Sequence, residues 1–549
     1  MDKRKRAEGP AISADPRGTV KQSLRQSMSS LHTWTGLLPG WLLFVIFLFG
    51  TVAYYQQEIS RWMRPELSSA ALSSGALSPA ALDAADALLR GKAPTAAEWS
   101  LSFPEGRGGD GLAVSWPKTE PAAAAAGGKR PKPHEVTLDP RSGIVVEPRD
   151  TRGGYFLYRM HFDLHYMPVM WARYLVSIAA LAMLVAILSG VVTHKKIFAD
   201  FFLLRFGKGQ RSWLDAHNVT AVMALPFYLM ITYTGLVTLL FTLMPWAISA
   251  NFASQEAYYD VAFPSAPTLA PSGRRAAVLP LRRLIASAQR EIPGFEPGYI
   301  TIANPGDAVA TAEMYPQYDT LGSQRGAIVL NAATGKVLRA PPRAGGATMT
   351  KDTMIDLHAG RYSGPGLRAL YFLSGALGTV MVATGLVLWT VKRRAKLPDP
   401  TRPHFGFRVA ERLNIGVIVG APAGIAMYFL ANRLLPLGLE NRADYEINSL
   451  FIAWGAILVW GAARPARMAW IESLAACAAL YALVPVVNAL TTQRGLLASL
   501  REGDGIFVCF DLGMLLVAAI FAFAAWRVRT RRARPAPRRK QRDTNGAFA

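Results

Sequence analysis

Long, almost continuously apolar stretches alternate along the chain with polar and basic segments. A hydrocarbon core about 30 Å thick is crossed by about 20 helical residues, so apolar runs of this length predict transmembrane helices. The pattern indicates a polytopic α-helical membrane protein with about eight transmembrane helices. The first four are predicted at residues 30–61, 161–197, 215–245 and 358–395, and four more fall within residues 413–527.

The second of these helices carries histidines near both of its ends. His165 and His194 are 29 residues apart, which corresponds to about 43 Å of continuous helix. That length exceeds the hydrocarbon thickness, so the two imidazoles are expected near opposite faces of the membrane. A chain with possible metal ligands at both faces is suited to passing electrons across the bilayer.

Two segments between the predicted helices have the pattern of small folded domains. They comprise residues 62–160 and 246–357, and each contains a helical pattern followed by a strand-turn-strand pattern. These patterns occupy residues 79–90 and 136–146 in the first segment and residues 279–290 and 327–338 in the second. We therefore expect two small α+β domains outside the membrane.

The chain has a formal net charge of +23. The basic residues gather in short segments beside the predicted helices, where the positive-inside rule expects them on the cytoplasmic side. The loops 198–214 and 396–412 and the tails 1–29 and 528–549 are therefore predicted to be cytoplasmic. Because the bilayer accounts for this charge, no nucleic-acid partner is expected.

The last four predicted helices contain four residues with possible chemistry. Cys477 and Cys509 are the two cysteines of the chain, and both lie in apolar runs. Neither predicted outer domain can therefore hold a disulfide, and thiolate metal sites are not expected. Glu472 and Asp511 are carboxylates on predicted spans, where buried acids often mark function; interfacial exposure is the alternative.

The first 395 residues contain an internal repeat. His32 and His217 are each followed after 18 residues by a glycine, Gly50 and Gly235. The second and fourth predicted helices both open with the triplet Asp-Leu-His, at residues 163–165 and 356–358. The chain therefore contains two copies of helix, domain, helix. Residues 396–549 have no counterpart in the repeat.

The repeat brings histidines together in pairs. It places His32 with His217 at the cytoplasmic face and His165 with His358 at the opposite face. Two imidazoles from facing helices of a four-helix bundle match bis-imidazole ligation of a haem iron. The alternative is that interfacial histidines only anchor helix ends. Zinc fits less well, because it usually requires three or four ligands in a tetrahedral cluster.

Two further histidines leave the ligand set open. His194 lies on the cytoplasmic side and competes with His32 as the partner of His217. His161, one helical turn before His165, is an alternative ligand or a residue on the substrate side. Glycines in the spans allow either close helix packing or insertion of a porphyrin. They are Gly50, Gly190, Gly235, Gly375, Gly378 and Gly385.

Several motifs resemble those of a known family. They include Ser30-Leu-His32-Thr-Trp-Thr-Gly36, Ser189-Gly-Val-Val-Thr-His194, Asp215-Ala-His217 and the two Asp-Leu-His triplets. In combination these residues resemble the PepSY-associated transmembrane helix family of iron-regulated inner-membrane proteins. The hairpins starting at Asp139 and Asn331 are similar to those of PepSY domains, with Asn331 departing from the usual Asp. The resemblance covers residues 28–395.

The resemblance implies a location, a cofactor and an activity. Family members include ferric-siderophore reductases of the bacterial inner membrane. The resemblance implies that two haem b groups carry electrons from an unknown cytoplasmic donor to a periplasmic ferric siderophore. No side chain is expected to be catalytic. The axial ligands of the haem iron are expected among His32, His165, His194, His217 and His358.

Two other functions are compatible with the sequence. One is a non-enzymatic PepSY membrane protein that binds or regulates periplasmic partners. The other is a component of a siderophore or iron permease, built on the last four predicted helices, which extend beyond the four-helix core of the resemblance.

Overall fold

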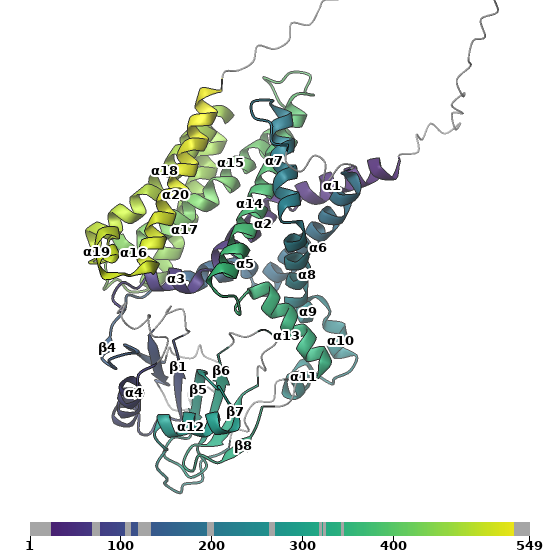
Figure 1. Cartoon of the computed structure of the whole chain (residues 1–549). Helices are drawn as coiled ribbons and strands as arrows, with labels where there is room; N and C mark the ends of the chain where they lie inside the picture. Colours follow the sequence, from purple (N-terminus) through teal and green to yellow (C-terminus); the bar gives the residue numbers. More distant parts are fainter. Residues whose placement is uncertain are drawn as a thin grey trace, which may run out of the picture.

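The computed structural model consists of a helical body and a sheet domain beyond one of its ends (Figure 1). Most of each predicted basic tail lies outside the residues that it describes. The described residues are 23–67, 77–104, 111–118, 133–194, 203–262, 269–317, 321, 326–341 and 345–531.

The first span of each repeat is a bent pair of helices. Helices α1 (Leu24–Leu37) and α2 (Gly40–Ala53) meet at 63°, and α7 (Gln210–Met223) and α8 (Leu225–Thr238) meet at 68°. A proline lies at each bend, Pro39 before α2 and Pro226 in the first turn of α8. Proline lacks the N–H that would continue the helix, so both spans break at corresponding places.

The second span of each repeat is preceded by a separate short helix. Helix α5 (Gly153–Asp163) comes before α6 (Val169–Thr193), and α13 (Gly346–Ala359) comes before α14 (Pro365–Arg394). The prediction of one continuous helix from His161 to His194 is therefore wrong. The break begins at Leu164, which has a φ of 43° and cannot continue a right-handed helix.

Six helices are long and apolar enough to cross a membrane, and there are up to eight if each bent pair is one span, among the described residues. This agrees with the predicted polytopic architecture. The C-terminal part contributes α15 (Phe405–Ile418), α16 (Gly420–Leu434), α17 (Arg442–Ala463), α18 (Ala466–Thr491) and α20 (Gly505–Thr530). Shorter helices are α3 (Gln56–Trp62), α9 (Leu240–Leu243), α10 (Pro245–Ser249), α11 (Gln255–Ala262) and α19 (Leu496–Glu502).

The two predicted outer domains share a single antiparallel sheet. Its strand order is β4-β3-β2-β1-β5-β6-β7-β8, and the central β1–β5 pair joins the two copies. The strands are β1 (Glu98–Ser102), β2 (Leu112–Trp116), β3 (His134–Leu138), β4 (Val145–Val146), β5 (Pro297–Ala303), β6 (Thr311–Pro316), β7 (Ile328–Asn331) and β8 (Val337–Arg339). The expectation of two separate domains is therefore corrected to one body with one hydrophobic core.

The predicted helices and hairpins of these domains are present. Helices α4 (Pro79–Lys92) and α12 (Leu281–Glu291) contribute to the shared core. Each hairpin turns at a side chain whose oxygen accepts backbone N–H groups two and three residues further on, Asp139 in one copy and Asn331 in the other. Asn331 therefore replaces Asp without changing the turn, since its amide oxygen accepts the same bonds.

Candidate functional site

One pair of histidine rings joins the bent spans to each other. His32 on α1 faces His217 on α7, with ring centroids 6.2 Å apart and the ring planes at 63°. The internal repeat predicts this pair. Helices α1 and α7 lie at the end of the bundle far from the sheet domain (Figure 1).

A second pair lies on the short helices α5 and α13. The rings of His161 and His358 have centroids 6.0 Å apart and planes at 31°. The predicted pairing of His165 with His358 is thus not what the structure shows. His165 follows the break at Leu164, and its ring stacks on Phe451 of α17 at 5.8 Å.

The Asp-Leu-His triplets suggested the wrong equivalence between the repeats. They do not open spans, because Asp163 ends α5 and Asp356 lies in the last turn of α13. The left-handed residues after these helices, Leu164 and Gly360, are the structural counterparts. Aligning them sets His165 against Arg361 and brings His161 within one position of His358.

His194 does not supply the ring that faces His217. It is the C-cap of α6, with φ −90° and ψ 91°, and the residues that follow it, 195–202, lie outside the described part of the chain. The ring opposite His217 is that of His32. Between the two candidates from the sequence, the geometry therefore favours His32.

All four paired histidines are held in the same way. In each, Nδ1 lies within hydrogen-bonding distance of a backbone carbonyl on the adjoining span. The acceptors are Ala186 for His32 (2.8 Å), Met381 for His217 (2.9 Å), Ile46 for His161 (2.8 Å) and Ile231 for His358 (3.0 Å). A carbonyl oxygen only accepts, so Nδ1 donates and Nε2 of the neutral ring keeps its lone pair.

A glycine lies four residues after each of these carbonyls, and the imidazole rests against it. A Cβ added there would lie 2.6 Å from a ring carbon of His161 at Gly50 and 2.8 Å from one of His358 at Gly235. At Gly190 and Gly385 it would lie 3.1 Å from ring carbons of His32 and His217. These four glycines therefore make room for imidazoles. Sequence reasoning named them without recognising this contact.

Two other glycines singled out in the sequence allow close helix packing. A Cβ at Gly375 would lie 2.6 Å from Thr51, and one at Gly378 would lie 2.5 Å from the ring of Phe47. Their role is thus the close approach of α14 to α2.

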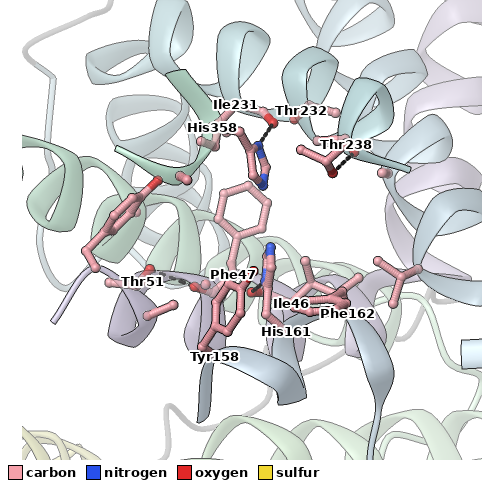
Figure 2. A pocket seen from close by; sticks show the side chains of 18 of the residues that line it. Ile46, Phe47, Thr51, Tyr158, His161, Phe162, Ile231, Thr232, Thr238 and His358 are labelled. Carbon is pink, nitrogen blue, oxygen red and sulfur yellow. Dashed lines mark hydrogen bonds between the residues drawn. The ribbon is translucent and has the colours of Figure 1, made fainter. Parts of the chain in front are cut away.

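A cavity of about 420 Å³ surrounds the second histidine pair. Figure 2 shows His161 and His358 pointing toward each other from opposite sides of it. The rest of the lining is mainly apolar and aromatic, including Phe47, Tyr158 and Phe162, while Arg361 adds positive charge and Arg173 pairs with Asp163 at 3.0 Å. Sequence reasoning missed both arginines, because neither belongs to a recognisable motif.

The two histidine pairs lie at different levels of the bundle. Helix α14 passes both, since Gly375 borders the cavity and Gly385 contacts His217. Ten helical residues separate these glycines, or about 15 Å along the helix axis. The two pairs are therefore separated along the bundle by about half the thickness of a hydrocarbon core of about 30 Å.

The described residues contain no cluster of three His, Cys, Asp or Glu side chains placed to hold a metal ion. The ligand geometry that they offer is the pair of facing imidazoles.

Comparisons with known proteins agree with the sequence motifs. The chain is 26% identical to an uncharacterized protein of Pseudomonas aeruginosa over 373 residues, which cover 64% of this chain and 90% of that protein. Residues 29–392 match the family described as the PepSY-associated TM region. The chain therefore belongs to the PepSY-associated TM region family of multi-pass membrane proteins.

Proposed function

We propose that this protein is a b-type dihaem oxidoreductase that moves electrons across the bacterial inner membrane to a periplasmic ferric siderophore. The observation that carries the proposal is the pair of facing imidazoles at each end of the bundle. His32 with His217 would hold one haem, and His161 with His358 would hold the other.

The spacing of the rings supports axial ligation. A metal lies about 2 Å from an imidazole nitrogen, and that nitrogen is roughly 1 Å from its ring centre, so two axial rings have centres about 6 Å apart. The observed separations are 6.2 and 6.0 Å. In each ring the bond from Nδ1 to a carbonyl leaves Nε2 as the nitrogen able to bind iron.

The cavity between His161 and His358 also suits a haem. Its volume of about 420 Å³ lies within the roughly 300–1,000 Å³ of small-molecule and cofactor pockets. Its apolar walls match the macrocycle, and the guanidinium group of Arg361 matches a propionate carboxylate.

Bound haem would supply one-electron chemistry, and the side chains would tune and position it. The carbonyl bonds fix the orientation of each imidazole and raise its basicity as a ligand. Apolar residues such as Phe47 and Phe162 would reduce the contact of a bound haem with water. Haems held by these two pairs, about 15 Å apart along the bundle, would divide the membrane crossing into two shorter transfers.

The expected acceptor follows from the chemistry of iron. Hard oxygen donors of a siderophore bind the trivalent ion much more strongly than the divalent ion, so one electron per iron is sufficient for release. We place both termini and the pair His32/His217 on the cytoplasmic side, near an unidentified electron donor. The sheet domain would then lie in the periplasm, on the side of His161 and His358.

Substitution of single histidines tests the proposal. Purified wild-type protein should show a low-spin b-type spectrum, and His161→Ala or His358→Ala should each remove one haem. The control is His165→Ala, which should retain both haems because that ring stacks on Phe451 instead. A wild-type protein without haem, or loss of haem in the control with retention in His161→Ala, would overturn the assignment.

A further inference from the structure

Helix α5, which carries His161, is attached to a part of the chain that the family match does not include. We define the C-terminal unit as residues 405–530, which contain α15 to α20. The match to the family ends at residue 392. Contacts between this unit and α5 occur at the beginning of the helix, along one side of it, and just after its end.

The beginning of α5 is fixed by buried hydrogen bonds to α16 and α17. The Tyr428 hydroxyl donates to the Gly153 carbonyl at 3.0 Å, and the Thr151 hydroxyl donates to the Glu446 carboxylate at 2.5 Å. Thr151, Tyr428 and Glu446 are all buried. A buried polar group that loses its partner is costly, so these bonds strongly favour one position of the helix start.

Glu446 is itself held rigidly. Asn432 donates to its carboxylate at 2.8 Å, and Arg442 forms an ion pair with it. Arg442 also donates to the Asp150 carbonyl at 3.1 Å, on the segment that leads into α5. Removing one member of a buried ion pair leaves an uncompensated charge. The network therefore gives the start of α5 a stiff support.

The start of α5 also lies directly against the backbone of α3. A Cβ on Gly154 would lie 2.0 Å from the carbonyl oxygen of Gln56. The Gly154 N–H donates to the Ser60 hydroxyl at 3.0 Å. The helix is thus confined between α3 and the C-terminal unit.

The two sides of α5 have different neighbours. Phe156, Leu157 and Met160 belong to one hydrophobic cluster with Tyr428 and Phe429 of α16. The other side, with Tyr158, His161 and Phe162, lines the cavity. A shift of the C-terminal unit would therefore displace α5, and the imidazole of His161 on the other side of this helix would move with it.

The segment after α5 is attached to the same unit. The rings of His165 and Tyr166 both contact Phe451 of α17, and the Tyr166 hydroxyl donates to the Asn448 side chain. Helix α13, which carries the opposing His358, packs instead on α8 and lies away from the C-terminal unit (Figure 1). The attachment is therefore specific to one of the two ligands.

We infer that the C-terminal unit is a positioning device for His161, with Tyr428, Thr151 and Glu446 as positioning residues. The inference rests on the proposed haem function, because it assigns the unit the task of setting the distance and angle of one axial imidazole. The pair His32/His217 lies at the other end of the bundle and should not depend on these bonds.

Two nearly isosteric variants test this. Tyr428→Phe removes the hydroxyl that donates to the Gly153 carbonyl. Thr151→Val removes a hydroxyl that donates to Glu446 and accepts from the Gly153 N–H at 3.1 Å. Tyr481→Phe is the matched control, because Tyr481 is a buried tyrosine of the same unit that stacks on Phe521 at 6.0 Å. The midpoint potential and low-spin electron paramagnetic resonance signal of each haem are measured in the full-length protein, as is amide hydrogen exchange in α5.

Both variants should shift the potential and signal of one haem and leave those of the other unchanged, which also shows that the protein is folded. Exchange within α5 should become roughly fivefold faster in Tyr428→Phe, as expected for the loss of one hydrogen bond, and at least as fast in Thr151→Val, which loses two. The control should change neither quantity. Unchanged haem signals with unchanged exchange in both variants would overturn the positioning role.

The hydrogen-exchange measurement separates the two proposals. A wild-type protein that binds no haem would refute the proposed function. In such a protein, faster exchange in α5 for Tyr428→Phe, but not for Tyr481→Phe, would still support attachment of α5 by the C-terminal unit, and equal exchange would refute it.

Discussion

At the scale of single residues, the site is built from one motif used four times. An imidazole rests on a glycine, and its Nδ1 donates to the carbonyl four residues before that glycine. In a helix, a carbonyl normally accepts the backbone N–H of the fourth residue after it. Because that residue is a glycine without a side chain, the imidazole can also reach the carbonyl. The motif joins residues more than 100 positions apart, which is why the sequence shows histidines and glycines but not their contact.

Replacing one of these glycines should displace its histidine. Gly50→Ala would place a Cβ 2.6 Å from a ring carbon of His161, so we expect the protein to lose one haem and keep the other. Gly455→Ala is the control, because a Cβ there meets nothing within 4 Å. The control should retain both haems and be more stable by about 0.5–1 kcal/mol. The measurements are haem content and thermal unfolding; full haem content in Gly50→Ala would contradict the motif.

The charge of Arg361 should matter for retention of the cofactor. Arg361 lines the cavity and is exposed, so its attraction to a carboxylate is worth only about 0.2–1 kcal/mol. Arg361→Ala should therefore release haem up to about fivefold faster, and added salt should reduce the difference. Haem transfer to apomyoglobin gives the rate. Arg282→Ala, at an exposed ion pair of the sheet domain, should release haem at the wild-type rate, and an equal rate in Arg361→Ala would reject the contact.

At the scale of elements, periodicity predicts most helices but not their breaks. Apolar runs identified the spans, and the hairpins at Asp139 and Asn331 were predicted from turn residues. The separation of α5 from α6 was missed because Leu164 adopts a φ of 43°, which is rare for leucine. The matching Asp-Leu-His triplets led to His165 as the predicted ligand, whereas the structure places His161 opposite His358.

The shared sheet predicts that the two copies of the outer domain unfold together. Leu101 on the joining strand β1 is fully buried in their common core, so Leu101→Ala should cost about 2–5 kcal/mol. Hydrogen exchange should accelerate in β6 and β7 as well as in β2 and β3. Leu338→Ala, at an exposed position of β8, should leave both halves protected. Acceleration confined to β2 and β3 would show that the halves are independent.

At the scale of the whole molecule, three parts surround the two histidine pairs. The two copies of the repeat carry the paired histidines, the sheet domain lies beyond one end, and the C-terminal unit supports α5 (Figure 1). The apolar runs and the strand-turn-strand patterns predicted the repeated spans and the folded outer regions, but not that these regions share one sheet. The sequence could not predict the role of the third part, since this unit has no counterpart in the repeat and its contacts with α5 span more than 250 residues.

The two carboxylates noted in the last spans have structural partners. Asp511 is fully buried and accepts hydrogen bonds from Trp62 and Asn488, so it ties the C-terminal unit to α3. Glu472 pairs with Arg464 in a partly exposed position. Asp511 is therefore the buried carboxylate and Glu472 the partly exposed one, and neither lies at the histidine pairs.

The haem content of the purified full-length protein tests the central claim most directly. The structure contains two pairs of facing imidazoles, so we predict two b-type haems per chain, both low-spin in the ferric state because both axial positions are filled. A pyridine haemochrome assay gives the number, and electron paramagnetic resonance gives the spin state. Absence of haem, or a high-spin ferric signal that shows an open axial position, would contradict the account.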